Sequence, residues 1–345
     1  MDAIAQEESI VKSSLLYSYQ VENDDPYGTF AASLDQMAVA EELGYDAVLV
    51  SEHHLVENGY FPAPFVTLGA IAMRTRKLRM GQGVLLLPLY DPLHVAEHAT
   101  ILDHVSRGRS ILGVGYGYRQ EEFDAFNVRL DDRGARMSEG LEAIRLMWTQ
   151  PEATFVGKHF RYQRVRLRPR PFQDPHPPIW MASKAVGAVK AAARLADAWF
   201  ADPVTPLSVL ESRMAHYKAS LAKQGKPTRG FDFPLMREVY CAPTDEQAWE
   251  EAREGMMAVY QEYLDWGHML DDEGQPVPPG DARALGLLRS RFIVGSPETC
   301  IREAIRYRDT LGATNLVMRM KFPGIPAERV MRSIRLWGEQ VMPNL

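Results

Sequence analysis

Short apolar runs alternate with segments of helical spacing along the whole chain. The eight runs are residues 10–19, 45–54, 78–87, 110–115, 178–182, 198–201, 233–241 and 315–320. The second run contains Ala-Val-Leu-Val at 47–50, which is small or β-branched and uncharged, as in a strand that is covered on both faces. Each run is followed by a segment in which apolar residues recur at helical spacing. With right-handed crossovers, eight such units predict an α/β fold closed as a (β/α)8 TIM barrel.

Two insertions interrupt this alternation. Residues 155–167 predict a hairpin that turns at Gly157-Lys158, after the fourth strand–helix unit. Residues 267–291, before the last strand–helix unit, form a long stretch rich in proline and glycine. A loop of that length in a compact domain is typical of a mobile lid. We find neither a linker nor a repeat, so we expect one domain over residues 1–345.

The composition argues against several classes of protein. The chain is 46% hydrophobic and 24% charged, and no apolar run approaches the ~18 residues of a membrane span. A net charge of -6 disfavours a general nucleic-acid binder. The arginine-rich run 161–170 is therefore interpreted as a solvated hairpin face or a subunit contact. The polar start lacks the pattern of a secretory signal, and Cys241 and Cys300 are too few for a disulfide framework. We expect a cytoplasmic protein.

The second run ends in titratable residues. Glu52, His53 and His54 follow it directly, and in α/β barrels the chemistry lies at the carboxyl ends of the strands. An unperturbed histidine titrates near ~6.5, so His53 can exchange protons at neutral pH. The structural alternative is a histidine that is hydrogen-bonded at a barrel mouth. His54 points to the other face of an extended backbone, which argues against both histidines binding one metal.

A second histidine pair spells the inverted zinc-peptidase pattern. His94, Glu97 and His98 give H-x-x-E-H, and the two histidines share one face of a helix. That helix is expected to pack outside the barrel, and no third ligand is evident. We therefore favour a surface or packing role and predict no metal site.

Glycines interrupt the third run and follow the fourth. Gly81 and Gly83 lie inside residues 78–87, where glycine indicates a bulge, a bend or close approach by a ligand. The loop at 113–117, GVGYG, offers backbone amides that suit a phosphate at a helix start. A Rossmann fingerprint is disfavoured, because the loop follows the fourth strand and lacks the spacing of the third glycine.

Several separate motifs carry a resemblance to one family. They are SEHHL at 51–55, MGQGVLLLP at 80–88, LDHVSRGRSILGVGYGYRQEEFDAF at 102–126, PPIWMAS at 177–183, VGSPETC at 294–300 and the ending VMPNL. On these motifs the chain resembles the bacterial luciferase-like flavin-dependent monooxygenases, and the likeness covers nearly all of its length. The resemblance implies a TIM barrel that binds reduced flavin.

The resemblance also implies roles for individual residues. His53 matches the catalytic histidine, and Glu52 matches an acid of the flavin pocket. Gly83 and Val84 match a non-proline cis peptide under the flavin ring. The loop around the flavin phosphate and ribityl chain falls on Gly115, Tyr116, Gly117, Tyr118 and Arg119, and Glu122 matches an acid near that chain or the ring.

Two departures from the family pattern leave the phosphate contacts open. Tyr116 stands where many relatives have arginine, so the cationic contact could shift to Arg119. Ala185 stands where relatives often have a phosphate-binding serine, and Ser183 and Lys184 are nearby substitutes. The same departures leave room for deazaflavin F420 in place of FMN.

The function implied by the resemblance is a two-component monooxygenase. A separate flavin reductase would supply reduced FMN, O2 would form a flavin C4a-hydroperoxide, and this would oxidise an apolar organic substrate. The lid at 267–291 would keep water from the intermediate. The alternatives are an F420-dependent hydride-transfer oxidoreductase on the same barrel and a non-catalytic flavin-binding protein. The resemblance further implies a homodimer or higher homo-oligomer.

Overall fold

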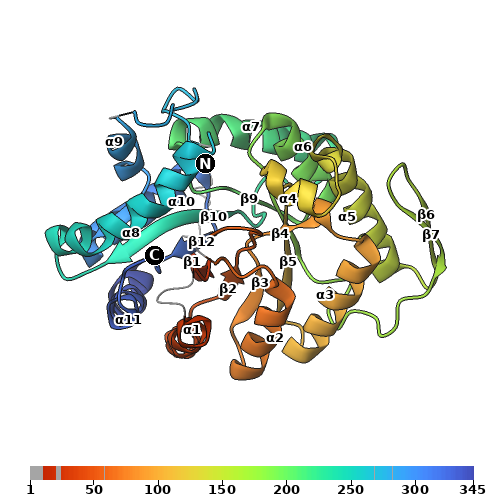
Figure 1. Ribbon diagram of the computed structural model, residues 1–345, viewed down its shortest axis with the longest axis horizontal. Coiled ribbons are helices and arrows are strands. Elements are labelled where there is room, and N and C mark those ends of the chain that lie inside the picture. Colours follow the sequence, from red (N-terminus) through yellow and green to blue (C-terminus); the bar gives the residue numbers. More distant parts are fainter. Residues whose placement is uncertain (1–10, 21–24, 58, 268, 282) are drawn as a thin grey trace, which may run out of the picture.

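A curled parallel sheet surrounded by helices forms the centre of the molecule (Figure 1). The computed structural model describes residues 11–20, 25–57, 59–267, 269–281 and 283–345. Its parallel strands are β1 (Lys12–Tyr17), β2 (Ala47–Val50), β3 (Arg79–Gln82), β4 (Leu85–Leu86), β5 (Ser110–Gly115), β8 (Ile179–Ala182), β9 (Ala198–Phe200), β10 (Pro234–Cys241), β11 (Ile293–Gly295) and β12 (Asn315–Arg319). The expected α/β class is confirmed.

The strand order brings the two ends of the sequence together. Hydrogen-bonded neighbours follow the path β11-β10-β12-β1-β2-β3-β5-β8-β9, with β4 on β5. The last strand of this path also returns toward β10, because a parallel bridge joins Ala201 to Leu235. The Ala201 amide donates to the carbonyl of Pro234, and the Met236 amide donates to the carbonyl of Ala201, both at 3.0 Å. The sheet thus curls until the residue after β9 bridges to the start of β10.

Helices cover the outside of this sheet. They are α1 (Pro26–Glu42), α2 (Pro64–Arg74), α3 (Pro92–Ser106), α4 (Gln120–Ala125), α5 (Arg133–Thr149), α6 (Val186–Leu195), α7 (Leu207–Lys223), α8 (Asp245–Asp265), α9 (Ala284–Arg289), α10 (Pro297–Leu311) and α11 (Ala327–Leu336). Their boundaries follow from capping chemistry. The Asp91 carboxylate accepts the Leu93 amide at 2.8 Å before α3, and Gly312 ends α10 in the left-handed region at φ 74°.

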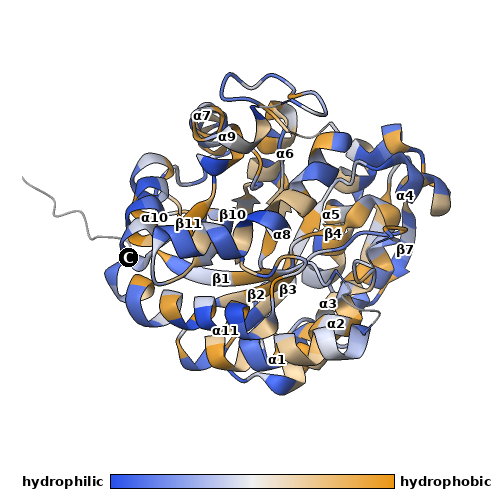
Figure 2. Cartoon of the chain, turned by 60° about the vertical axis from the view of Figure 1, so that its left-hand side comes forward, coloured by the Kyte–Doolittle hydropathy of each residue, from blue (hydrophilic) through white to orange (hydrophobic). Residues whose placement is uncertain are grey.

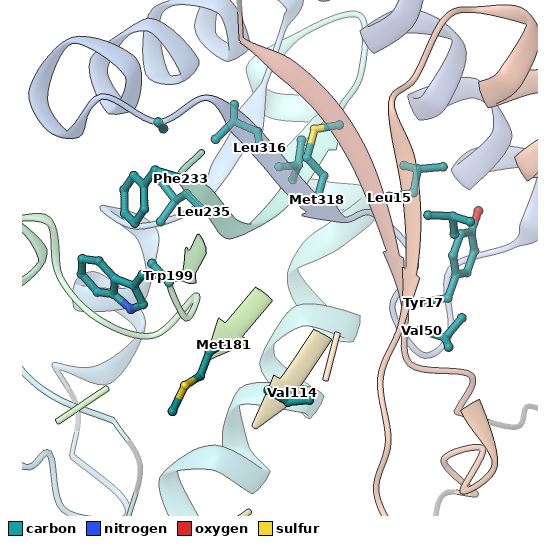
Figure 3. Close-up of a cluster of buried hydrophobic side chains, with 14 of the residues drawn as sticks. Leu15, Tyr17, Val50, Val114, Met181, Trp199, Phe233, Leu235, Leu316 and Met318 are labelled. Carbon is teal, nitrogen blue, oxygen red and sulfur yellow. The ribbon is translucent and has the colours of Figure 1, made fainter. Parts of the chain in front are cut away.

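Successive strand residues belong to two different cores, because side chains alternate between the faces of a strand. Leu15, Val114 and Met318 belong to the large outer cluster between strands and helices, part of which Figure 3 shows. Leu16 and Val317 belong to a small cluster that contains strand residues inside the curled sheet. Figure 2 shows the hydrophobic colour on the central strands and the hydrophilic colour on outward parts of the helices. The inner cluster forms the apolar base under the site described below.

The structure departs from the sequence predictions at three places. The run 78–87 is not one strand but β3 and β4, separated at Gly83–Val84, where the peptide bond is cis. The short strand β11 beside β10 was not predicted. The stretch 267–291, expected to be a plain loop, contains helix α9 and a bridge between Leu270 and Pro276; its residues 268 and 282 lie outside the described residues.

The first part of the arginine-rich run lies on a separate antiparallel hairpin that projects from the body of the molecule (Figure 1). Its strands are β6 (Ala153–Val156) and β7 (Arg161–Val165). Arg164 and Arg166 both pair with the carboxylate of Glu152, at 3.0 and 2.7 Å. These arginines are therefore partly neutralised within the hairpin itself.

Two further sequence patterns can be compared with the described residues. No helix among them combines the length and apolarity that a membrane span requires. His94 and His98 stack on one face of α3 with ring centroids 6.1 Å apart, but no group of three or more metal-ligating side chains is found in the described part of the chain.

Candidate functional site

A cavity of about 960 Å³ opens among the loops that follow the carboxyl ends of the strands. This volume lies at the upper end of the range for ligand pockets. The predicted site residues that line it are Glu52, His53, Gly83, Val84, Gly115, Tyr116, Gly117, Tyr118, Ser183 and Lys184. Arg119 and Glu122 are not among its lining residues. Four separate segments of the sequence thus meet at one site.

His53 is held from behind by Glu122. Its Nδ1 lies 2.9 Å from Oε1 of Glu122, on the short helix α4, and the same oxygen accepts the backbone amide of His54 at 2.9 Å. A carboxylate accepts, so Nδ1 carries the hydrogen and Nε2 of the neutral ring is left with a lone pair. The hydroxyl of Tyr118 lies 3.4 Å from Nε2. This geometry leaves Nε2 as the nitrogen that can exchange a proton.

The surroundings of Glu122 favour its charged form. Burial acts to raise the pKa of this carboxyl, but the hydrogen bond and charge of His53, the His54 amide and Arg119 together lower the pKa below its usual value. Glu122 is fully buried, and its Oε2 makes no hydrogen bond to any described residue. A buried carboxylate beside His53 stabilises the imidazolium that forms when Nε2 accepts a proton.

Glu52 lines the cavity, as the resemblance implied for an acid of the pocket, and its carboxylate is engaged by the protein. Its Oε2 accepts the Leu86 amide at 2.6 Å, and its Oε1 accepts the Tyr90 hydroxyl and lies 3.2 Å from Nε2 of His54. Both oxygens are therefore occupied by protein groups. The side chain borders the cavity, but its contacts hold the backbone of β4 against the end of β2.

The floor of the cavity is apolar and shaped by glycine. A Cβ at Gly83 would lie 2.8 Å from Cδ1 of Leu16, and one at Gly115 would overlap the side chain of Val84. Gly117 adopts φ 70°, and a Cβ there would lie 2.8 Å from Phe123. A side chain at these positions would clash with its protein neighbours, so only glycine allows the backbone of the floor to pack this closely against them.

The opposite end of the cavity is cationic. Lys184 and Arg213 line it together with Asp202, and Arg133 is a further cation of the cavity lining. Burial lowers the pKa of both Lys184 and Arg213, and the charge of Asp202 opposes this in each case. Arg213 on α7 is fixed in place, because its Nη1 donates to Thr205 Oγ1 at 2.8 Å, and that hydroxyl donates to Asp202.

Helix α6 directs its amino end to this cationic region. Its N-cap residue Ala185 provides no side-chain cap, and Gly187 and Ala188 of the first turn line the cavity. The first amides of a helix have no acceptor within it, so they bind anions well. The Ser183 hydroxyl is buried beside them and makes no hydrogen bond within the described part of the chain. This end can hold a phosphate.

Arg119, the alternative cation for the phosphate, is engaged elsewhere. Its Nη1 donates to the carbonyl of His54 at 2.8 Å and lies 3.5 Å from Glu122. Its guanidinium also lies over the ring of Trp266, 5.1 Å from the centroid. Arg119 thus braces the His53 end of the site.

Sequence reasoning missed several residues at the His53 end. Tyr60, Tyr263 and Arg319 line the cavity there, and Arg319 pairs with buried Glu238 through a 2.8 Å bond from Nε. The sequence carried a signal for Arg319 and Glu238, because a charged residue inside an apolar strand is rare unless it is paired. Arg319 lies in LVMRM, and Glu238 follows another arginine in β10. The two tyrosines carried no such signal.

Three aromatic residues of β8 and β9 lie in different places. Phe200 lines the cavity. Trp180 belongs to the inner cluster of strand residues, and Trp199 belongs to the outer core, where its indole donates to the Ser183 carbonyl at 2.9 Å. Trp199 is therefore a core residue.

Three curated relatives show a family with more than one chemistry. The 4-hydroxyprotoasukamycin monooxygenase of Streptomyces nodosus subsp. asukaensis is 28% identical, over 93% of this chain and 88% of the relative. The oxygenase component of the flavin-dependent trigonelline monooxygenase of Acinetobacter baylyi is 27% identical, over 66% and 62%. The F420-dependent glucose-6-phosphate dehydrogenase of Nakamurella multipartita is 26% identical, over 90% and 91%.

A solved structure and a family profile agree with these relatives. The crystal structure of monooxygenase RslO1 from Streptomyces bottropensis superposes with a TM-score of 0.86 at 25% identity, covering 96% of this chain and 99% of that one. The profile described as luciferase-like monooxygenase matches residues 11–315. The chain therefore belongs to the luciferase-like monooxygenase family.

Proposed function

We propose that this protein is a flavin-dependent monooxygenase that uses reduced FMN and O2 to oxidise an apolar organic substrate. The observation that carries the proposal is the cavity with two different ends. One end presents Nε2 of His53 above an apolar floor, and the other presents Lys184, Arg213 and the amides of α6. A molecule with a flat ring system and a phosphate matches both ends at once.

The residues present fit FMN on two independent grounds. The floor of the cavity is apolar, and glycine at 83 and 115 lets its backbone pack closely against Leu16 and Val84, which a Cβ at either position would meet. The buried Ser183 hydroxyl, unpartnered among the described residues, lies beside the uncapped amino end of α6, where a phosphate would supply the missing acceptor. We therefore assign the ring to the floor and the phosphate to Ser183, Arg213 and the α6 amides, with Tyr116 and Gly117 along the chain between them.

When bound, reduced FMN supplies two electrons, so that one atom of O2 enters the substrate and the other leaves as water. His53 moves the protons that this reaction requires, through Nε2. Glu122 orients the imidazole through Nδ1 and stabilises its protonated form. Glu52 keeps β4 against β2, which preserves the cavity floor.

The segment after α8 closes the His53 end from the solvent side. Trp266 lies 5.8 Å from the His53 ring, and Leu270 lines the cavity. Arg291 anchors this segment, because its guanidinium donates to the carbonyl of Val204 at 2.5 Å and to that of Leu270 at 2.6 Å. We propose that residues 267–291 act as the lid that keeps water out during turnover.

F420-dependent hydride transfer is the second candidate. One specific observation favours it: the cavity lining contains a third cation, Arg133, besides Lys184 and Arg213. A cofactor with more negative charge than FMN could use it, although Asp131 and Asp202 also line the cavity. The F420-dependent relative at 26% identity supports the same alternative. In that case the ring and phosphate positions stay the same, and O2 takes no part.

A protein that binds flavin without turnover is the third candidate. The His53–Glu122 pair argues against it, because a buried acid aimed at a histidine in the cavity has no purpose in binding alone. The change His53→Ala tests this. We expect flavin binding to persist and substrate oxidation to fall by ~10²- to 10⁴-fold. An unchanged oxidation rate would remove the catalytic role of His53.

The partners and the assembly are part of the proposal. The trigonelline relative is an oxygenase component, which supports a separate reductase as the source of reduced FMN. The bridge between Ala201 and Leu235 supports a closed (β/α)8 barrel as a single cytoplasmic domain. Val66, Met73 and Ile101 are 77%, 64% and 50% exposed on the neighbouring helices α2 and α3, which supports a homodimer. Light scattering on the wild type and on Met73→Glu tests this assembly.

A further inference from the structure

Aromatic rings surround His53 on the side that faces the cavity. The ring centroids of Tyr60, Tyr118 and Trp266 lie 5.1, 5.7 and 5.8 Å from that of His53. Tyr263 extends the group, 5.8 Å from Trp266. Tyr60, Tyr118 and Tyr263 line the cavity, so a molecule bound beside His53 meets aromatic surfaces. Aromatic partners gain stacking and edge-to-face contacts there that an alkyl chain cannot make.

The charges at this end are paired with one another. Nε and Nη2 of Arg319 both donate to Glu238, and the Tyr260 hydroxyl donates to the same carboxylate at 2.9 Å. Both Arg319 and Glu238 are almost fully buried. On the other side, Glu122 is engaged by His53 and Arg119. A charged ligand would lose its hydration here and would find no unpaired opposite charge among the described residues of the cavity lining at this end. The pairing of these side chains therefore favours an uncharged ligand.

Among the polar groups at this end that have no hydrogen bond within the described residues, the Tyr60 hydroxyl belongs to a side chain that lines the cavity, whereas Glu122 and Arg119 do not line it. The Tyr60 hydroxyl is buried and makes no hydrogen bond to any residue in the described ranges. Burial is the main cause that raises the pKa of Tyr60 well above its usual value, so the hydroxyl stays neutral and can donate. A buried hydroxyl without a partner is costly, and an oxygen on a ligand would satisfy it.

We infer that the substrate is an uncharged aromatic compound bearing a carbonyl or hydroxyl oxygen. Its ring packs among Tyr60, Tyr118 and Tyr263, and its oxygen bonds to the Tyr60 hydroxyl. This inference rests on the proposed function, because it calls the bound molecule a substrate. Binding of that molecule by these residues needs no turnover. It can therefore be measured apart from the oxidation.

The experiment measures ligand binding to the protein with oxidised FMN, and again without flavin, by quenching of tryptophan fluorescence. The probes are naphthol, naphthalene, naphthoate and decanal. We expect naphthol to bind most tightly. In Tyr60→Phe the advantage of naphthol over naphthalene falls by ~3- to 10-fold, the range for one neutral hydrogen bond. Tyr263→Phe, the matched control in the same cavity, keeps the advantage.

Three outcomes would overturn the inference. They are tighter binding of naphthoate or decanal than of naphthol, an unchanged preference in Tyr60→Phe, and a loss that appears in Tyr263→Phe instead. The wild-type probe series alone decides the case if Tyr60→Phe does not fold. Tight naphthol binding through Tyr60 without any O2 consumption would reject the oxygenase and leave the recognition intact. O2 consumption together with a preference for decanal would support the oxygenase and reject the recognition of an aromatic substrate.

Discussion

Nδ1 of His53 and Oε1 of Glu122 lie 2.9 Å apart, across 69 residues of sequence. The contact joins the end of β2 to the short helix α4, which follows the glycine loop after β5. The same oxygen accepts the His54 amide, so it fixes both the ring and the backbone of the histidine pair. The position of the proton-exchanging nitrogen therefore depends on a residue from another loop.

Replacing Glu122 tests this dependence. In Glu122→Gln the carboxamide retains an acceptor oxygen but loses the charge that stabilises the imidazolium, so we expect oxidation to slow by ~10-fold or more while flavin still binds. Glu121→Gln, a neighbouring exposed carboxylate on α4, is the matched control. Steady-state rates and a flavin titration measure both effects. Equal rates in the two variants would show that Glu122 does not act through His53.

The lowered pKa of Glu122 predicts how stability depends on pH. Its carboxylate stabilises the fold fully above the unfolded pKa of about 4.3, and this contribution is lost as the pH falls through the lower folded value. The stability advantage of the wild type over Glu122→Gln should therefore shrink in acid. Denaturant unfolding at a series of pH values measures it.

The pKa of Glu262 is shifted in the direction opposite to that of Glu122. Burial raises its pKa, so its neutral form is favoured in the folded state. Its contribution to the stability of the fold is present below the pKa of the unfolded state. That contribution is lost as the pH rises through the pKa of the folded state. The wild type should lose stability relative to Glu262→Gln as the pH rises. The same direction for both variants would contradict these assignments.

Arg213 is expected to bind the cofactor phosphate. Arg213→Gln removes a charge-assisted bond of about 1.5–3 kcal/mol, so we expect FMN to bind ~10- to 100-fold more weakly. Riboflavin, which lacks the phosphate, should bind the variant and the wild type equally. Lys218→Gln, on the exposed side of the same helix, is the control. A parallel loss of riboflavin affinity would indicate a folding defect instead.

The buried pair of Arg319 and Glu238 predicts a strong coupling in stability. Arg319→Met leaves the Glu238 carboxylate buried without its partner and should reduce the free energy of unfolding by about 3–5 kcal/mol. Adding Glu238→Gln should recover much of this loss, because the unpaired charge is then gone. A double-mutant cycle in denaturant measures the coupling. Additive effects of the two changes would show that the pair is not coupled.

Local patterns were sufficient for the fold class and for one part of the site. The apolar run at 47–50 followed by Glu52, His53 and His54 identified the end of a strand and its titratable groups, and both are in place. Gly83 indicated a bulge, a bend or close approach by a ligand, and it lines the cavity, as does Gly115 of the glycine loop. Such features are local, because strand patterning and glycine geometry are properties of short segments.

The remaining features depend on contacts across the fold. Trp266, from the segment after α8, draws Arg119 to the His53 end, and no spacing in the sequence indicated that pairing. Arg213 reaches the cavity from the middle of α7, where an arginine is ordinarily a surface residue. The Tyr60 hydroxyl can be recognised as unpartnered only when its surroundings are known.

The central claim is that the cavity binds reduced FMN and reacts with O2. An anaerobic titration with reduced FMN, and separately with reduced F420, followed by rapid mixing with oxygenated buffer, tests it most directly. We predict tight binding of reduced FMN, O2 consumption, and an absorbance transient that free FMN does not give. Tight binding of F420 alone, without O2 consumption, would contradict the account and support hydride transfer on the same fold.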